Sequence, residues 1–169
     1  MILTGQLLIE DGSGGCRLRT GHVRLDGESI AEISLDEPAP KGGRSIRDVF
    51  GGHDCLICPG FIDAHLHLSQ FGIIGAHGLP LLRWLEEFTF PEEDKWHDPE
   101  LATSTTTTAL EELLRHGTTG IAAYATVHHE ATRRCIQVAE RKGVRALIGQ
   151  VLMDCNAPAS LCRPAAQLL

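Results

Sequence analysis

Hydrophobic and polar residues alternate in short runs along the first part of the chain, up to about residue 55. Alternation with a period of two is typical of half-buried β-strands, and it predicts strands over 2–10, 22–26 and 29–34. The step Asp26-Gly27-Glu28 lies between two of these runs and predicts a β-hairpin. Residues 38–54 are rich in proline, glycine and charge without any period, which predicts a loop or a ragged extra strand.

The pattern changes near residue 55, where CLICPGFIDAHLH forms a nearly unbroken apolar run. Runs of this kind occur in strands buried on both faces of parallel sheets, so we expect a strand over 56–66. Apolar residues then recur at helical spacing over 81–88. A second helix is predicted between Asp98, a residue type that caps helix N-termini, and Gly117, where the apolar face stops.

The second half of the chain alternates strand and helix patterns. We expect strands over 117–125 and 144–153, a helix over 129–142 between them, and the start of a further helix at Pro164. A β-α-β-α-β order implies parallel strands joined by right-handed helical crossovers, in a doubly wound sheet or in a TIM-type barrel. Three parallel strands cannot close a barrel of eight, so the sequence looks truncated.

Composition and charge exclude several classes of protein. The chain has 169 residues, of which 43% are hydrophobic and 22% charged, a composition that predicts a soluble globular protein. No apolar run reaches the ~18 residues of a membrane span, and a formal charge of -7 offers no bulk attraction to nucleic acid. The N-terminus lacks a basic and apolar signal segment, which predicts a cytoplasmic protein with free thiols. The cysteines are Cys16, Cys55, Cys58, Cys135, Cys155 and Cys162.

Asp63, His65 and His67 occupy alternate positions at the end of the predicted strand over 56–66. Alternate residues of a strand point to one face, so we expect the two imidazoles to aim at one point. Two histidine nitrogens suit zinc or iron, but a catalytic zinc takes three protein ligands and a water molecule. The pair is therefore expected to be half of a metal site.

Two other groups have the residue types for chemistry. Cys55 and Cys58, with His53 nearby, have the spacing of half a zinc ribbon, but a second C-x-x-C is missing from the sequence, so ordinary thiols are favoured. His128 and His129 follow a predicted strand and could approach a substrate. Surface histidines at the start of a helix are the commoner case, and we favour that interpretation.

The segment PGFIDAHLH resembles the first-strand signature of the amidohydrolase superfamily, and HLSQFG, LPLLRWLEEFTFPEE, HGTTG and YATVH make the chain similar to its guanine deaminase family. The resemblance implies a metal-dependent TIM-type barrel that starts within 56–169 and a β-sandwich partly built from a β module over 1–55. It implies a zinc enzyme that hydrolyses guanine to xanthine and ammonia, and a homodimer for the complete enzyme. Guanine or a related purine is the implied partner, without nucleic acid or membrane.

The family's site residues carry over by position in the motif. His65 and His67 match the first two metal ligands, and His67, Leu68, Ser69 and Gln70 match the first substrate-contacting segment. The Gln70 amide has donors and an acceptor, as the reading of a purine edge requires. The third metal-binding histidine, the catalytic glutamate and the metal-binding aspartate of the family come from later strands. The resemblance therefore implies no catalytic residue within this chain and predicts that the chain is inactive alone.

Two alternative functions stay open on the sequence. The chain could belong to another amidohydrolase, an aminohydrolase or chlorohydrolase that acts on a different heterocycle. It could also be a non-catalytic truncated product that binds a partner, for example the open sheet of an intact homologue.

Overall fold

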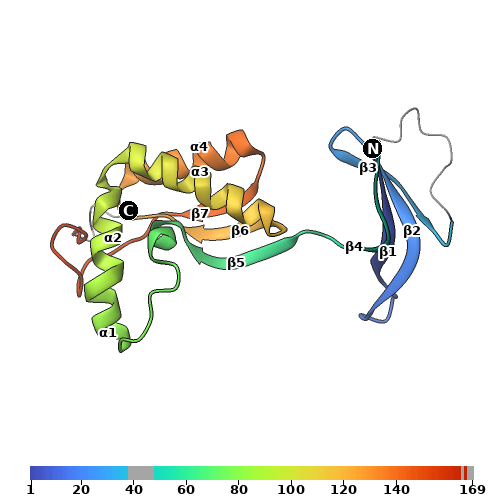
Figure 1. Ribbon diagram of the computed structural model, residues 1–169. Coiled ribbons are helices and arrows are strands. Elements are labelled where there is room, and N and C mark those ends of the chain that lie inside the picture. Colours follow the sequence, from blue (N-terminus) through green and yellow to red (C-terminus); the bar gives the residue numbers. More distant parts are fainter. Residues whose placement is uncertain (38–47, 165, 167–169) are drawn as a thin grey trace. The chain divides into compact units, whose positions relative to one another are not determined.

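The computed structural model describes residues 1–37, 48–164 and 166. The chain divides into two compact units, Met1–Pro59 and Gly60–Leu169 (Figure 1). The division falls at Pro59 rather than near residue 55, because Leu56 and Ile57 still pair with the first strand of the chain. Each unit has its own sheet.

The first unit is a four-stranded sheet of β1 (Ile2–Glu10), β2 (Cys16–Asp26), β3 (Ser29–Leu35) and β4 (Val49–Ile57), in the order β3-β2-β1-β4. Strand β1 pairs antiparallel with β2 and parallel with β4. The predicted hairpin is confirmed, because Asp26 pairs with Ser29 across a turn in which Gly27 has a φ of +57°. Glycine adopts this left-handed conformation at no steric cost.

The segment that leads into the second unit corrects one prediction. Of the two alternatives for 38–54, an extra strand is right for Val49–Ile57, which forms β4, while residues 38–47 lie outside the described residues. A single strand over 56–66 is wrong, because β4 ends at Ile57 and a new strand begins at Phe61 in the other sheet. Pro59 has no N–H to donate to a ladder, so it divides the apolar run.

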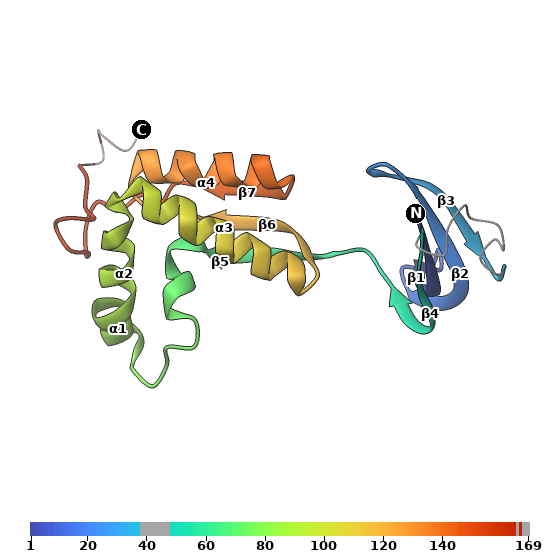
Figure 2. The same cartoon turned by 45° about the horizontal axis from the view of Figure 1, so that its top comes forward.

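The second unit is a parallel sheet with helices on one face. Its strands are β5 (Phe61–His67), β6 (Thr118–Tyr124) and β7 (Arg145–Gly149), in the order β5-β6-β7. Helices α3 (Pro99–Arg115) and α4 (His129–Lys142) lie side by side along this sheet (Figures 1 and 2). The predicted β-α-β-α-β order is confirmed, and the second unit is an α/β fold.

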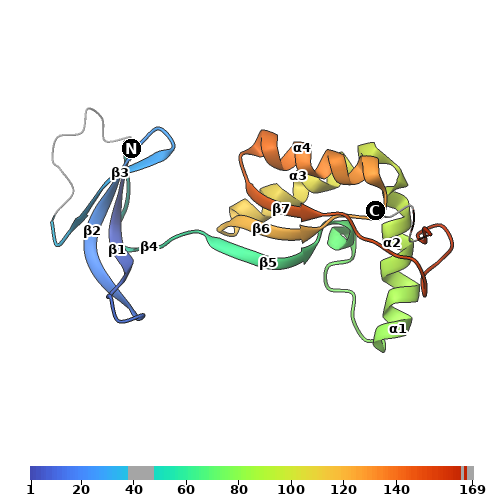
Figure 3. The ribbon, with the colours of Figure 1, turned by 180° about the vertical axis from the view of Figure 1, so that it is seen from behind.

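The core of the second unit lies between the sheet and the two helices α3 and α4. Figure 3 shows the unit from the side of the sheet, with the helices beyond it. The side of α4 predicted to be buried is confirmed, with Ala131, Cys135, Val138 and Ala139 all at most 3% exposed. Small side chains on α3 and α4 allow the helices to approach each other closely. The buried residues that α3 and β6 add are Ala102, Ala109, Leu110, Ile121 and Ala123.

The helix ends follow the local signals in the sequence. Asp98 caps α3, because its carboxylate accepts a hydrogen bond from the Glu100 N–H at 2.9 Å. Gly117 and Gly143 follow α3 and α4 with positive φ angles of 89° and 67°, as helix C-caps require.

The last part of the chain departs from its prediction in one respect. Strand β7 is shorter than the predicted 144–153, since it ends at Gly149. The helix predicted to begin at Pro164 falls on residues 165 and 167–169, which lie outside the described residues. No helix in the described part of the chain is long and apolar enough to cross a membrane.

A series of short helical turns connects β5 to α3. A 3₁₀ turn, η2 (Leu68–Ile73), follows β5. The helix predicted over 81–88 is present but longer than expected, because helical turns continue without a gap beyond residue 88. Pro91 lies within this longer helix, and a π-helical turn precedes that proline. A wider turn accommodates a residue that has no N–H for the usual ladder. The successive turns are α1 (Leu81–Trp84), η3 (Leu85–Thr89), α2 (Phe90–Asp94) and η4 (Lys95–His97).

Candidate functional site

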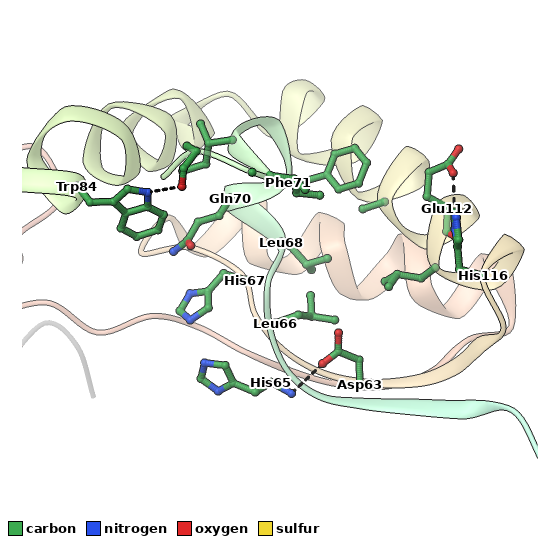
Figure 4. Close-up of a pocket in the computed structure, with 16 residues that line it drawn as sticks. Asp63, His65, Leu66, His67, Leu68, Gln70, Phe71, Trp84, Glu112 and His116 are labelled. Carbon is green, nitrogen blue, oxygen red and sulfur yellow. Dashed lines mark hydrogen bonds and ion pairs between the residues drawn. The ribbon is translucent and has the colours of Figure 1, made fainter. Parts of the chain in front are cut away.

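His65 and His67 lie together at the carboxyl end of β5 (Figure 4). Their ring centroids are 5.3 Å apart, and the ring planes make an angle of 69°. Tyr124 pairs with His67 in the parallel ladder of β5 and β6, and its ring stacks on His67 with centroids 4.9 Å apart. The two imidazoles therefore come together as the strand spacing predicts.

Asp63 does not join the two histidines as the strand spacing predicts. Its carboxylate turns back and accepts a hydrogen bond from the backbone N–H of His65 at 3.1 Å. The register between β5 and β6 slips between Asp63 and Leu66, which breaks the simple alternation of side chains in the strand. In Figure 4 the two rings project together, while Asp63 lies beside the backbone.

The surroundings of His67 suit a metal ligand. Its Nδ1 atom is buried and has no hydrogen-bond partner among the described residues. Burial and the neighbouring His65 lower the pKa of His67, which favours the neutral ring that a metal requires. Within 1–37, 48–164 and 166, no cluster of three or more histidines, cysteines and carboxylates has the arrangement of a metal site. The unpartnered Nδ1 and lowered pKa of His67, together with the neighbouring ring of His65, fit a divalent metal with these two histidines as ligands.

A cavity of about 690 Å³ opens beside the histidines. The loop at its rim is tied down, because Trp84 donates a hydrogen bond from Nε1 to the backbone oxygen of Ala76 at 2.9 Å. The volume and the mostly apolar lining of this cavity are those of a site for a small ligand. Residues on its wall include His65, His67, Leu68, Gln70, Phe71, Trp84 and Leu113.

The segment expected to contact a substrate divides into wall and core. His67, Leu68 and Gln70 line the cavity, whereas Ser69 is fully buried and is not on the wall. Gln70 donates a hydrogen bond from Nε2 to Oε1 of Glu93 at 3.3 Å. Its amide is therefore tethered at the edge of the cavity.

Two residues near the site escaped the sequence analysis. Tyr124 could have been found, because parallel pairing of β5 with β6 places the end of one strand beside the end of the other. Glu93 could not, since a Glu-Glu pair on a short helix is expected to face solvent, and only the packing of α2 on η2 shows that it is buried.

The remaining candidates from the sequence are not among the residues that line this cavity. Cys55 and Cys58 are free and exposed, and His53 contacts Asp54 at 3.0 Å. His128 lies with its ring centroid 6.3 Å from that of His97. His129 shares a hydrogen bond of 3.3 Å with Gln150.

The parallel α/β unit with two histidines at the end of its first strand has a counterpart among known families. Residues 56–167 match the amidohydrolase family, so the chain belongs to that family. Within it, the predicted resemblance to guanine deaminases is confirmed by close relatives. The chain is 43% identical over 141 residues to a guanine deaminase of Dictyostelium discoideum, and the aligned segment covers 81% of this chain and 31% of that protein.

Other guanine deaminases agree in sequence and in structure. The guanine deaminase of Escherichia coli is 40% identical over 103 residues, covering 61% of this chain and 24% of that protein. The solved guanine deaminase of C. acetobutylicum, with guanine bound in its active site, superposes with a TM-score of 0.82 at 28% identity, over 99% of this chain and 40% of that one. The chain spans about a third or less of the length of the curated relatives.

Proposed function

We propose that this chain supplies part of the active site of a guanine deaminase, which hydrolyses guanine to xanthine and ammonia in purine catabolism. The observation that carries the proposal is the position of His65 and His67 on the wall of a cavity that also contains Gln70. The similarity to guanine deaminases over most of the chain supports the same substrate.

His65 and His67 are proposed to be two ligands of a catalytic zinc ion. The buried, unpartnered Nδ1 of His67 supports this role, because a buried polar atom without a partner is costly unless a ligand satisfies it. The chemistry that zinc supplies when bound is the activation of a water molecule as a nucleophile. Stacking on Tyr124 holds the His67 ring in place for that purpose.

Gln70 is proposed to contact the purine, together with His67, Leu68 and Ser69 of the same segment. Its amide offers an acceptor and donors to the mixed edge of a purine. Leu68 and Phe71 give the cavity apolar walls that suit a flat heterocycle. Ser69 would act from behind the wall, because it is fully buried.

The 169 residues are proposed to be inactive by themselves. Zinc catalysis takes three protein ligands and an acid or base, while the described residues offer the two histidines. We further propose that β5, β6 and β7 are the first three strands of a TIM-type barrel and that β1–β4 belong to a composite β-sandwich. A cytoplasmic homodimer is the proposed form of the complete enzyme.

The proposed activity is tested in a guanine deaminase chimera, in which this chain replaces the matching segment of the Escherichia coli relative. We expect the purified, zinc-loaded chimera to release ammonia from guanine and the His67→Ala chimera to release none. Preference for adenine, cytosine or a triazine would favour another amidohydrolase. A folded, zinc-loaded chimera without turnover of any of them would contradict an enzymatic role for this chain.

A further inference from the structure

Helix α2 carries a carboxyl side chain into the interior. Glu93 is only 2% exposed, whereas its neighbour Glu92 reaches Lys95 at the surface, with 2.5 Å between Oε2 and Nζ. Burial of a carboxyl group is unfavourable unless other polar groups compensate for it. The position of Glu93 therefore calls for a partner.

The local geometry of the helix directs Glu93 inward. The π-helical turn η3 ends at Thr89 and runs directly into α2, in which Glu93 is the buried residue. The helix then packs closely on η2, since a Cβ atom added at Gly72 would lie 2.7 Å from Oε1 of Glu92. This close approach brings the Glu93 carboxyl within reach of the segment that contains Ser69 and Gln70.

The partner of Glu93 is the amide of Gln70. Oε1 of Glu93 accepts from Nε2 of Gln70 at 3.3 Å, and an oxygen acceptor can pair only with the NH₂ side of an amide. The contact therefore fixes which way the amide faces. The Gln70 carbonyl oxygen and the other N–H have no hydrogen-bond partner among the described residues, and Gln70 lies at the edge of the cavity (Figure 4).

The rest of this buried cluster contributes no competing partner to Gln70. Oε2 of Glu93 and the hydroxyl of Ser69 are buried without a hydrogen-bond partner among the described residues. Burial raises the pKa of Glu93, and the hydrogen bond from Gln70 opposes that rise. The cluster is thus internal to the protein, with Gln70 as its one member on the cavity wall.

We propose that Glu93 is a positioning residue for substrate recognition, which holds the Gln70 amide so that its carbonyl oxygen accepts from an N–H group of the purine. This inference rests on the proposed function for its substrate. It predicts that Glu93 acts only through Gln70 and affects binding of guanine rather than the chemical step.

The test is a double-mutant cycle in the guanine deaminase chimera. Glu93→Leu releases the Gln70 amide, and we expect KM for guanine to rise on the order of tenfold with kcat within about twofold. Glu93→Gln lets the two amides pair in either sense, which halves the competent population and raises KM about twofold. Glu86→Leu, the matched control at an exposed position of the preceding turn η3, leaves both constants unchanged.

The cycle closes with Gln70→Ala. If Glu93 acts through Gln70, Glu93→Leu has no further effect on KM in the Gln70→Ala background. Full additivity of the two effects, or an unchanged KM in Glu93→Leu, would overturn the proposal. An equal fall in kcat would also overturn it.

A second measurement separates this inference from the proposed function. In the ¹⁵N-labelled 169-residue chain, the Gln70 side-chain amide signals should shift in Glu93→Leu and stay in place in Glu86→Leu. If the chimera lacks activity on guanine but the signals shift, the function proposal fails and the Glu93 contact stands. Signals that do not shift in Glu93→Leu would overturn the positioning role whatever the substrate.

Discussion

At the scale of single residues, the site depends on a few side chains with fixed partners. His67 stacks on Tyr124, and Gln70 is tethered to Glu93. Each contact removes rotational freedom from a side chain that faces the cavity, which prepares it for a ligand before the ligand arrives.

Substitution of Gln70 should weaken recognition of guanine without disturbing the metal ligands. In the guanine deaminase chimera we expect Gln70→Ala to lower kcat/KM by the equivalent of about 1–3 kcal/mol, because a buried purine group loses its hydrogen-bond partner. Zinc content should match that of the parent. Gln137→Ala on α4 is the control, and unchanged kcat/KM in Gln70→Ala would return Gln70 to a structural role.

Glu93 should make the stability of the chain depend on pH. Its folded pKa is raised above the ordinary 4.5, so the folded state binds more protons than the unfolded state, and stability falls as pH rises through the folded pKa. Glu93→Gln does not titrate. The unfolding free energy of Glu93→Gln minus that of the parent should therefore be larger at about pH 7.5 than at about pH 4. Urea unfolding at one protein concentration measures this difference. A gain that shrinks with rising pH would contradict the burial of Glu93.

Strand periodicity predicted the contact between His65 and His67 because both lie within five residues of one strand. It failed for Asp63, where a slip in register turns the side chain back. Glu93 was beyond prediction, because its burial depends on the packing of two segments that are distant in sequence.

At the scale of helices and strands, local signals determine the ends and tertiary pairing determines the membership of sheets. The helix over 129–142 has the bounds that its pattern predicts, since caps and apolar spacing are local. The strand over 56–66 was predicted wrongly, because the apolar run carries no information on which sheet each half joins. Only Pro59 marks the break.

The N-cap of α3 should contribute measurably to stability. Asp98→Ala removes the acceptor of the Glu100 N–H, and we expect a loss of about 1 kcal/mol in the free energy of unfolding. Asp98→Asn keeps a side-chain acceptor and should cost much less. Equal urea midpoints for Asp98→Ala and the parent would show that the cap does not stabilise the helix.

At the scale of the whole molecule, the parallel sheet of the second unit has one face without helices in the described part of the chain (Figure 3). Ile62 and Leu147, on its outer strands β5 and β7, are 75% and 76% exposed. Parallel sheets in stable proteins are covered on both faces.

The isolated 169-residue chain should therefore self-associate. The exposed apolar side chains and the strand edges of β5 and β7 offer surface for pairing with another copy. We expect concentration-dependent oligomers in analytical ultracentrifugation and a broad thermal transition by circular dichroism. A monodisperse monomer with a sharp transition would show that the exposed face does not need a cover.

The most direct test of the central claim is the metal content of the guanine deaminase chimera. If His65 and His67 are zinc ligands, the parent binds about one equivalent of zinc, and His65→Ala and His67→Ala each lose it, because the loss of a ligand removes both a donor and the geometry. His53→Ala, which removes a histidine whose side chain is 88% exposed, should keep the metal. Zinc near one equivalent in both His65→Ala and His67→Ala would contradict the account.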